Sequence, residues 1–70
     1  MALDMAVQRL QIGDVILVDI PDRDERIEAM VSREIERTES SVRVTLRVHG
    51  SDDVVREWPI GEMVTVVRGP

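Results

Sequence analysis

The chain has 70 residues, enough for one small domain, and it contains no cysteine, which excludes disulfides and thiolate zinc sites. Its 14 acidic residues outnumber its 9 basic residues, and the resulting net charge of −5 disfavours general affinity for nucleic acid. No apolar run approaches the roughly 18 residues of a membrane-spanning helix, and the first residues lack a basic-then-apolar signal. We therefore expect a soluble cytoplasmic domain that does not contact membranes.

Residues 1–12 are predicted to form a short amphipathic N-terminal helix or turn that precedes a domain at 13–68. Leu3, Val7 and Leu10 recur at the i, i+4, i+7 spacing of one helical face. Such an apolar stripe either closes the open end of a small core or docks on a second chain as a helix in a groove. These three residues are the candidate assembly residues.

Residues 13–68 predict an all-β domain of five short strands. Gly13-Asp14 precedes a β-rich run at 15–20, which Pro21 ends before a charged loop. From Val42 to Val48, apolar and polar residues alternate strictly, as in a half-buried strand. A turn at 50–53 leads to strand 54–58, and Pro59-Ile60-Gly61 forms a tight connection to the last strand, 63–68.

The segment 27–37 fits a helix and a strand almost equally well by periodicity. We favour a strand, because a hairpin loop at 38–41 then pairs this segment with strand 42–48. That pairing sets Ile35 opposite Val44, Val31 opposite Val48, and Glu36 opposite Arg43 as a favourable cross-strand ion pair. Five strands in so short a chain must curl to hide their edges, which predicts a small barrel.

Three features of the sequence resemble an SH3-like barrel: the opening Gly13-Asp14-Val15-Ile16-Leu17-Val18, the central hairpin, and the Pro59-Ile60-Gly61 turn before the final strand. Over residues 12–68 the chain is similar to a small actinobacterial SH3-like family of unknown function. All nine basic residues are arginine, a usage typical of a GC-rich bacterial genome. The first strand is also similar to that of MazF-type ribonuclease toxins, but the Arg-Pro pair that opens their second strand is absent here. These resemblances imply a fold and no activity.

The candidate binding residues are one aromatic residue and a set of basic residues. Trp58 is the only aromatic side chain, and it serves either as a recognition platform or as a plug at one end of the core. Arg43, Arg47 and His49 share the outer face of one strand, and we expect Arg56 nearby on the next strand. These cations either follow a phosphate backbone or pair across strands with acidic residues, namely Glu34, Glu36 and Glu57.

Metal, cofactor and catalytic chemistry find little support in the sequence. The acidic residues Asp19, Asp22, Asp24 and Glu25 lack the glycine and distal glutamate of an EF-hand loop, and two arginines compete with any cation there. With one histidine, no cysteine and no serine at a nucleophile elbow, we expect no enzyme, no metal and no cofactor.

The sequence therefore favours a non-catalytic interaction module. We expect a small subunit or homodimer in a larger bacterial assembly, with a protein as its partner. The alternative is a nucleic-acid-associated regulator of transcription or translation, an analogy with other small barrels.

Overall fold

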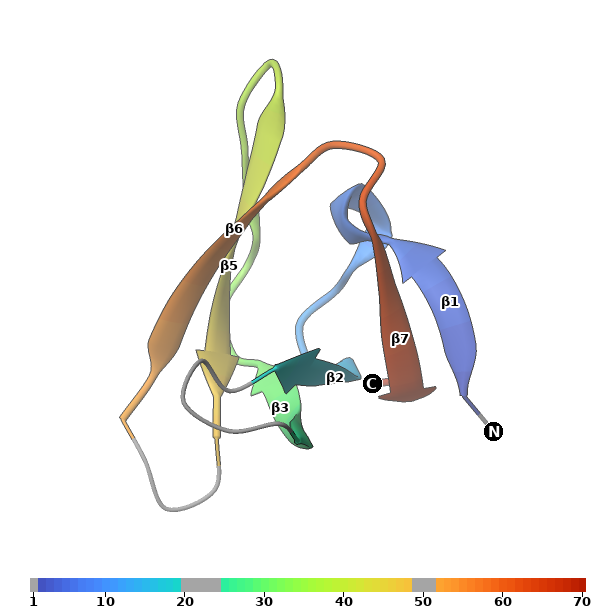
Figure 1. Cartoon of the computed structure of the whole chain (residues 1–70). Helices are drawn as coiled ribbons and strands as arrows, with labels where there is room; N and C mark the ends of the chain where they lie inside the picture. The colour runs from blue at the N-terminus through green and yellow to red at the C-terminus, as the bar shows by residue number, and fades with distance from the viewer. Residues whose placement is uncertain (1, 20–24, 49–51) are drawn as a thin grey trace.

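The computed structural model describes residues 2–19, 25–48 and 52–70, and these form one antiparallel sheet that curls into a half-barrel (Figure 1). The strand order is β1-β7-β2-β3-β5-β4, and β6 pairs with β5. The all-β prediction is confirmed, whereas the count of five strands is wrong. The elements are β1 (Leu3–Ala6), the 3-10 helix η1 (Val7–Arg9), β2 (Val15–Asp19), β3 (Arg26–Val31), β4 (Glu36–Arg37), β5 (Ser41–Arg47), β6 (Val54–Pro59) and β7 (Met63–Arg68).

The predicted N-terminal helix or turn is wrong for residues 3–6, which form the first of the two additional strands. β1 pairs with β7, with Leu3 opposite Val66 and Met5 opposite Val64. Leu3, Met5 and Val7 also alternate with period two, so the same apolar residues fit a strand once a sheet edge is available. Only the single 3-10 turn of η1 remains of the predicted helix.

The Gly13-Asp14 pair forms a turn that leads into β2. Gly13 has φ +96°, a backbone conformation that favours glycine. Asp14 is buried, and its Oδ2 accepts the N–H of Gln11 at 2.9 Å. The main chain continues the β2–β3 ladder here, because Val31 donates to the carbonyl of Asp14 at 2.8 Å and accepts from the N–H of Gly13 at 2.9 Å. Gly13-Asp14, one of the features that suggested the resemblance, therefore has a structural role at the start of β2.

The second additional strand arises because the predicted strand at 27–37 is broken. Glu36 lies opposite Arg43, as predicted, but Val31 lies opposite Leu46 and not Val48. Between these two pairings, residues 32–35 face only residues 44–45 of β5, so the register shifts by two residues. Ile35 still reaches the core, at 8% exposure. The strand is thus divided into β3 and β4.

The hydrophobic core lies inside the curl of the sheet. In β5, the buried residues Val42, Val44 and Leu46 alternate with outward-facing polar residues, as predicted. One end of the curl is closed by Val7, the first residue of η1, and by Leu10, which directly follows η1. The core cluster comprises Val7, Leu10, Ile16, Val18, Ala29, Val31, Ile35, Val42, Val44, Leu46, Val64 and Val66.

Some predicted features lie outside the described residues, namely His49, Pro21 with most of the charged loop, and the start of the turn at 50–53. Across the parts of the chain that the structure covers, none of the helical structure is long and apolar enough to cross a bilayer.

Candidate functional site

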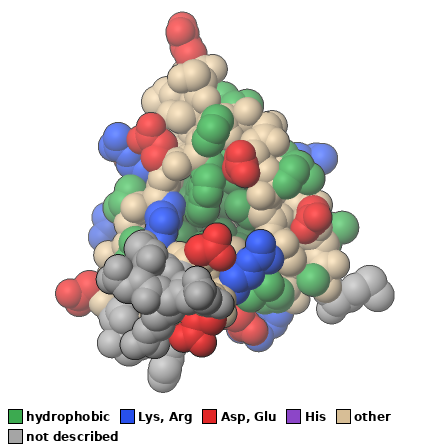
Figure 2. Space-filling model, viewed as in Figure 1, with side chains coloured by type: hydrophobic (Ala, Val, Ile, Leu, Met, Phe, Trp, Pro, Cys, Tyr) green, Lys and Arg blue, Asp and Glu red, His purple; other side chains and the backbone are tan. Residues whose placement is uncertain are grey.

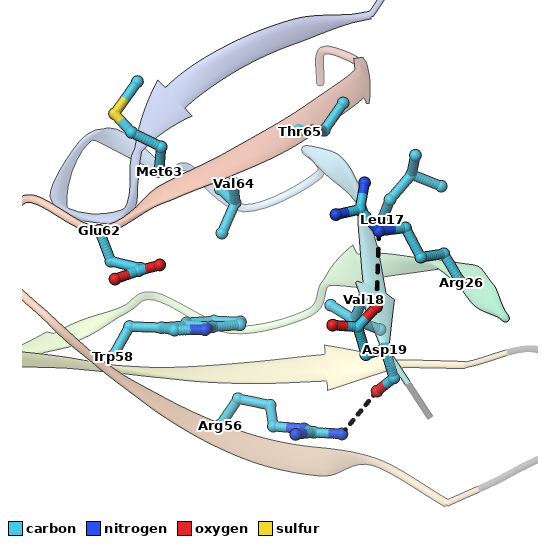
Figure 3. Close-up of a pocket in the computed structure, with 10 residues that line it drawn as sticks. All are labelled: Leu17, Val18, Asp19, Arg26, Arg56, Trp58, Glu62, Met63, Val64 and Thr65. Atoms are coloured by element: carbon cyan, nitrogen blue, oxygen red, sulfur yellow. Dashed lines mark hydrogen bonds and ion pairs between the residues drawn. The ribbon is translucent and has the colours of Figure 1, made fainter. Parts of the chain in front are cut away.

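A cleft lies where β6 and β7 diverge, although the two strands are consecutive in the chain. β6 pairs with β5, whereas β7 pairs with β1 and β2. The side of the curl between β6 and β7 is therefore open, and a cavity of about 210 Å³ occupies it (Figure 3). Its lining residues come from β2, β3, β6, the turn after β6 and the start of β7: Leu17, Val18, Asp19, Arg26, Arg56, Trp58, Glu62, Met63, Val64 and Thr65.

Trp58 forms one wall of this cleft because of the register between β5 and β6. It lies opposite Val42, a core residue, and directly opposite residues of an antiparallel pair point to the same face of the sheet. The indole is therefore on the core face, where it is half-buried and packs against the cluster. One part of the ring stabilises the core, and the rest is accessible from the cleft.

The turn that follows Trp58 positions the opposite wall. Glu62 donates its N–H to the carbonyl of Pro59 at 3.1 Å, and Gly61 has φ +96°, the geometry of a type II turn. The Oε1 of Gln8 accepts the N–H of Gly61 at 3.0 Å, which fixes the turn to η1. Figure 3 shows the Glu62 carboxylate directed toward the face of the Trp58 ring.

Two arginines define the end of the cleft at β2. Arg56 lies opposite Val44 and so shares the core face with Trp58. Its Nη2 donates to the main-chain carbonyl of Asp19 at 2.9 Å, while the Oδ1 of Asp19 lies 3.4 Å from Nε of Arg26. The cleft therefore combines an aromatic face with charges of both signs. Such a surface suits a side chain that has an apolar stem and a polar head.

The predicted basic face is divided by the sheet. Arg43 and Arg47 lie on the outer face, whereas Arg56 lies on the core face, so the expectation that Arg56 lies beside them is wrong. The cause is again the register, since odd-numbered residues of β5 face odd-numbered residues of β6. His49 lies outside the described residues. Arg43, Arg47 and Trp58 therefore do not form one contact surface.

The outer arginines are paired with acidic residues. Nη2 of Arg43 lies 3.3 Å from Oε1 of Glu57, and its Nη1 lies 3.7 Å from Oε2 of Glu36. Nε of Arg47 lies 3.4 Å from Oδ1 of Asp53. Glu34, the third expected partner, makes no ion pair with a described residue. Figure 2 shows the same mixture of signs, with acidic and basic side chains distributed around a central band of hydrophobic ones.

The three candidate assembly residues are also separated. Val7 and Leu10 are 0% and 3% exposed, and their side chains belong to the core of this chain. Leu3 is 62% exposed and lies in β1, the outermost strand of the sheet.

Sequence reasoning found Trp58 and Arg56 but did not assign Glu62 or Met63 to a site. A turn reverses the chain direction, so a residue directly after the turn glycine lies near the preceding strand. This position, directly after Gly61, was the sequence signal that could have placed Glu62 near Trp58. Asp19 and Arg26 were assigned only to a charged loop, because their proximity to Arg56 depends on how the sheet curls.

Comparison with known proteins adds no family to this geometry. The chain matches no protein-family model, no curated protein and no solved structure.

Proposed function

We propose that the chain is a non-catalytic interaction module that binds a segment of a protein partner in the Trp58 cleft. It acts as a small subunit or homodimer of a larger bacterial assembly in the cytoplasm. The observation that carries the proposal is the position of Trp58, the only aromatic residue, half-buried at an open side of the half-barrel. An aromatic ring that is fixed by the core on one side and accessible on the other is a typical anchor point at interfaces.

The strand order supports the SH3-like barrel as the closer description of the fold. Taking β4 as a continuation of β3, the strands after β1 lie in the order β7-β2-β3-β5-β6. In this order β7, the last strand, lies beside β2, as the last strand of an SH3-like barrel lies beside its first. β1 is an additional strand on the far side of β7. The likeness to an actinobacterial family remains a proposal on the same grounds.

The regulator alternative receives no support from the outer face. A phosphate-binding surface needs cations that are available to phosphate, whereas Arg43 and Arg47 each pair with carboxylates of the same chain. An acidic protein with paired arginines is better suited to a protein partner.

The test is capture of partners from native lysate, with nuclease present, on three immobilised proteins. These are the wild type, Glu62→Lys in the cleft wall, and Arg43→Ala on the outer face. Glu62 is exposed and its carboxylate is directed toward Trp58, so its replacement changes the cleft and leaves the core intact. We expect a partner retained by the wild type and by Arg43→Ala and lost by Glu62→Lys. Equal retention by all three proteins, or loss of the partner on nuclease treatment, would contradict the proposal.

A further inference from the structure

β1 is an edge strand whose outer side is open. It pairs only with β7, and Figure 1 shows it as the outermost strand of the sheet, with no described segment beside its far edge. Its sequence, Leu3-Asp4-Met5-Ala6, contains none of the lysines or prolines that commonly protect such edges. An edge of this kind presents unpaired N–H and C=O groups to another strand.

The hydrogen bonds to β7 show which residues present those groups. Val7 donates to the carbonyl of Glu62 at 2.9 Å, which continues the β1–β7 register by one residue beyond Ala6 opposite Met63. In an antiparallel ladder, bonded and non-bonded residues alternate. Leu3 and Met5 therefore bond to β7, and the N–H and C=O groups of Asp4 and Ala6 point toward the open edge.

We propose that a second copy of the chain binds this edge, with the two β1 strands antiparallel about a two-fold axis. Symmetry and charge select the register. An axis at Asp4 would set two like charges opposite each other, which is unfavourable. An axis at Met5 sets Asp4 of each copy opposite Ala6 of the other, and each of these pairs exchanges both backbone hydrogen bonds. An axis at Ala6 would pair Asp4 of each copy with Gln8 of the other, but Gln8 lies in η1, where the backbone is not extended.

The side chains agree with this register. Leu3 and Met5 lie opposite Val66 and Val64, so they share the apolar face, and Leu3 is 62% exposed in one copy alone. A hollow of about 330 Å³ adjoins them, with Pro70 in its lining. In the dimer this apolar row continues across the axis from one Met5 to the other.

The expected dimer is weak and is favoured by salt. A strand pair of four residues per copy buries less surface than a standard protein–protein interface. We therefore expect the dimer to dissociate at low protein concentration. Each copy carries a net charge of −5, and added salt screens their repulsion. The inference rests on the homodimer that the proposed function includes and specifies its interface. It fails separately from partner binding in the Trp58 cleft, because no residue of β1 lines that cleft.

Cysteine cross-linking tests the register directly in this cysteine-free chain. At the axis, the two residues at position 5 form a non-hydrogen-bonded pair, whose Cα atoms lie about 4.5 Å apart, within the range of a disulfide. In the same register the two residues at position 3 lie roughly 13 Å apart. On mild oxidation we expect Met5→Cys to form a covalent dimer about tenfold faster than Leu3→Cys. Faster cross-linking of the more exposed position 3 would overturn the proposal.

A proline variant tests the edge without a covalent bond. Ala6 has φ −66°, which proline adopts without strain, and its N–H takes no part in the β1–β7 ladder. By sedimentation equilibrium at 0.5 M salt, we expect the wild type and the control Ala6→Ser to dimerise with rising concentration. Ala6→Pro should remain a monomer with an unchanged circular dichroism spectrum. A monomeric wild type at about 1 mM, or a folded Ala6→Pro that dimerises equally, would overturn the proposal.

Discussion

The guanidinium of Arg56 is bound to the main chain of Asp19, from Nη2 to the carbonyl oxygen at 2.9 Å, and these residues are 37 positions apart in sequence. The bond joins β6 to the end of β2 across the side of the half-barrel where no ladder forms. Because the acceptor is a backbone carbonyl, the Asp19 carboxylate remains available to Arg26. Arg56 thus fixes the width of the cleft at its β2 end.

Replacement of Arg56 by methionine should lower the free energy of unfolding by about 1 kcal/mol, since it removes a charge-assisted hydrogen bond and keeps most of the apolar stem. The matched control is Arg47→Met, which removes only an exposed ion pair with Asp53 and should cost less than about 0.5 kcal/mol. Urea unfolding followed by the fluorescence of Trp58 measures both. An Arg47→Met cost equal to that of Arg56→Met would show that the bond across the cleft does not stabilise the fold.

The two glycines with positive φ should respond differently to alanine. At Gly61 an added Cβ has no atom within 4 Å, so only the backbone conformation is penalised, at about 1 kcal/mol. At Gly13 the Cβ would also lie 2.9 Å from Cβ of Pro70, a contact that forces one of them to move. We expect Gly13→Ala to cost about 2 kcal/mol or more in urea unfolding. A Gly13→Ala cost no greater than that of Gly61→Ala would contradict the close approach of Pro70.

Adjacent residues of β5 should separate the energetics of the two sheet faces. Val44 is completely buried, and truncation to alanine leaves a cavity, for which we expect a loss of about 2 kcal/mol. Arg43 makes two exposed ion pairs, and Arg43→Ala should cost less than about 1 kcal/mol. Raising the salt concentration should reduce the effect of the arginine change and leave that of the valine change unaltered. Similar costs and salt responses for both variants would refute the assignment of these residues to opposite faces.

Binding to nucleic acid should be weak. The negative net charge and the carboxylate partners of Arg43 and Arg47 leave little positive surface among the described residues. In fluorescence anisotropy at about 0.15 M salt, a labelled oligonucleotide should show no binding at micromolar protein. Tight binding that weakens steeply with salt and is lost in Arg43→Ala would instead support the regulator alternative.

The predictable parts of the fold are those whose signal is local. The alternation from Val42 to Val48 defined β5, and the strand 63–68 was placed at its observed bounds because a glycine turn precedes it. The break at 32–35 was not predictable, since a two-residue register shift leaves the apolar pattern of the segment intact. β1 was mistaken for a helix because its partner β7 lies about 60 residues later in the chain.

The same distinction applies to the candidate site. Composition identified Trp58, because a single aromatic residue stands out. The residues around it were not predictable, because Asp19 meets Arg56 through the curl of the sheet and not through sequence spacing. Arg56 was expected near Arg43 and Arg47, and only the pairing of β5 with β6 shows that it lies on the core face.

The position of β7 between β1 and β2 has a kinetic consequence. The pairs β2–β3, β4–β5 and β5–β6 each join strands that follow closely in sequence, whereas β7 must meet two strands from the other end of the chain. Closing that long loop costs more conformational entropy, so we expect β7 to dock after the rate-limiting step of folding. Val66→Ala should then accelerate unfolding with little effect on the refolding rate, while Val44→Ala should slow refolding. The half-barrel would acquire β7 only after the β2–β3 hairpin has formed, and β1, which pairs only with β7, would then complete the sheet.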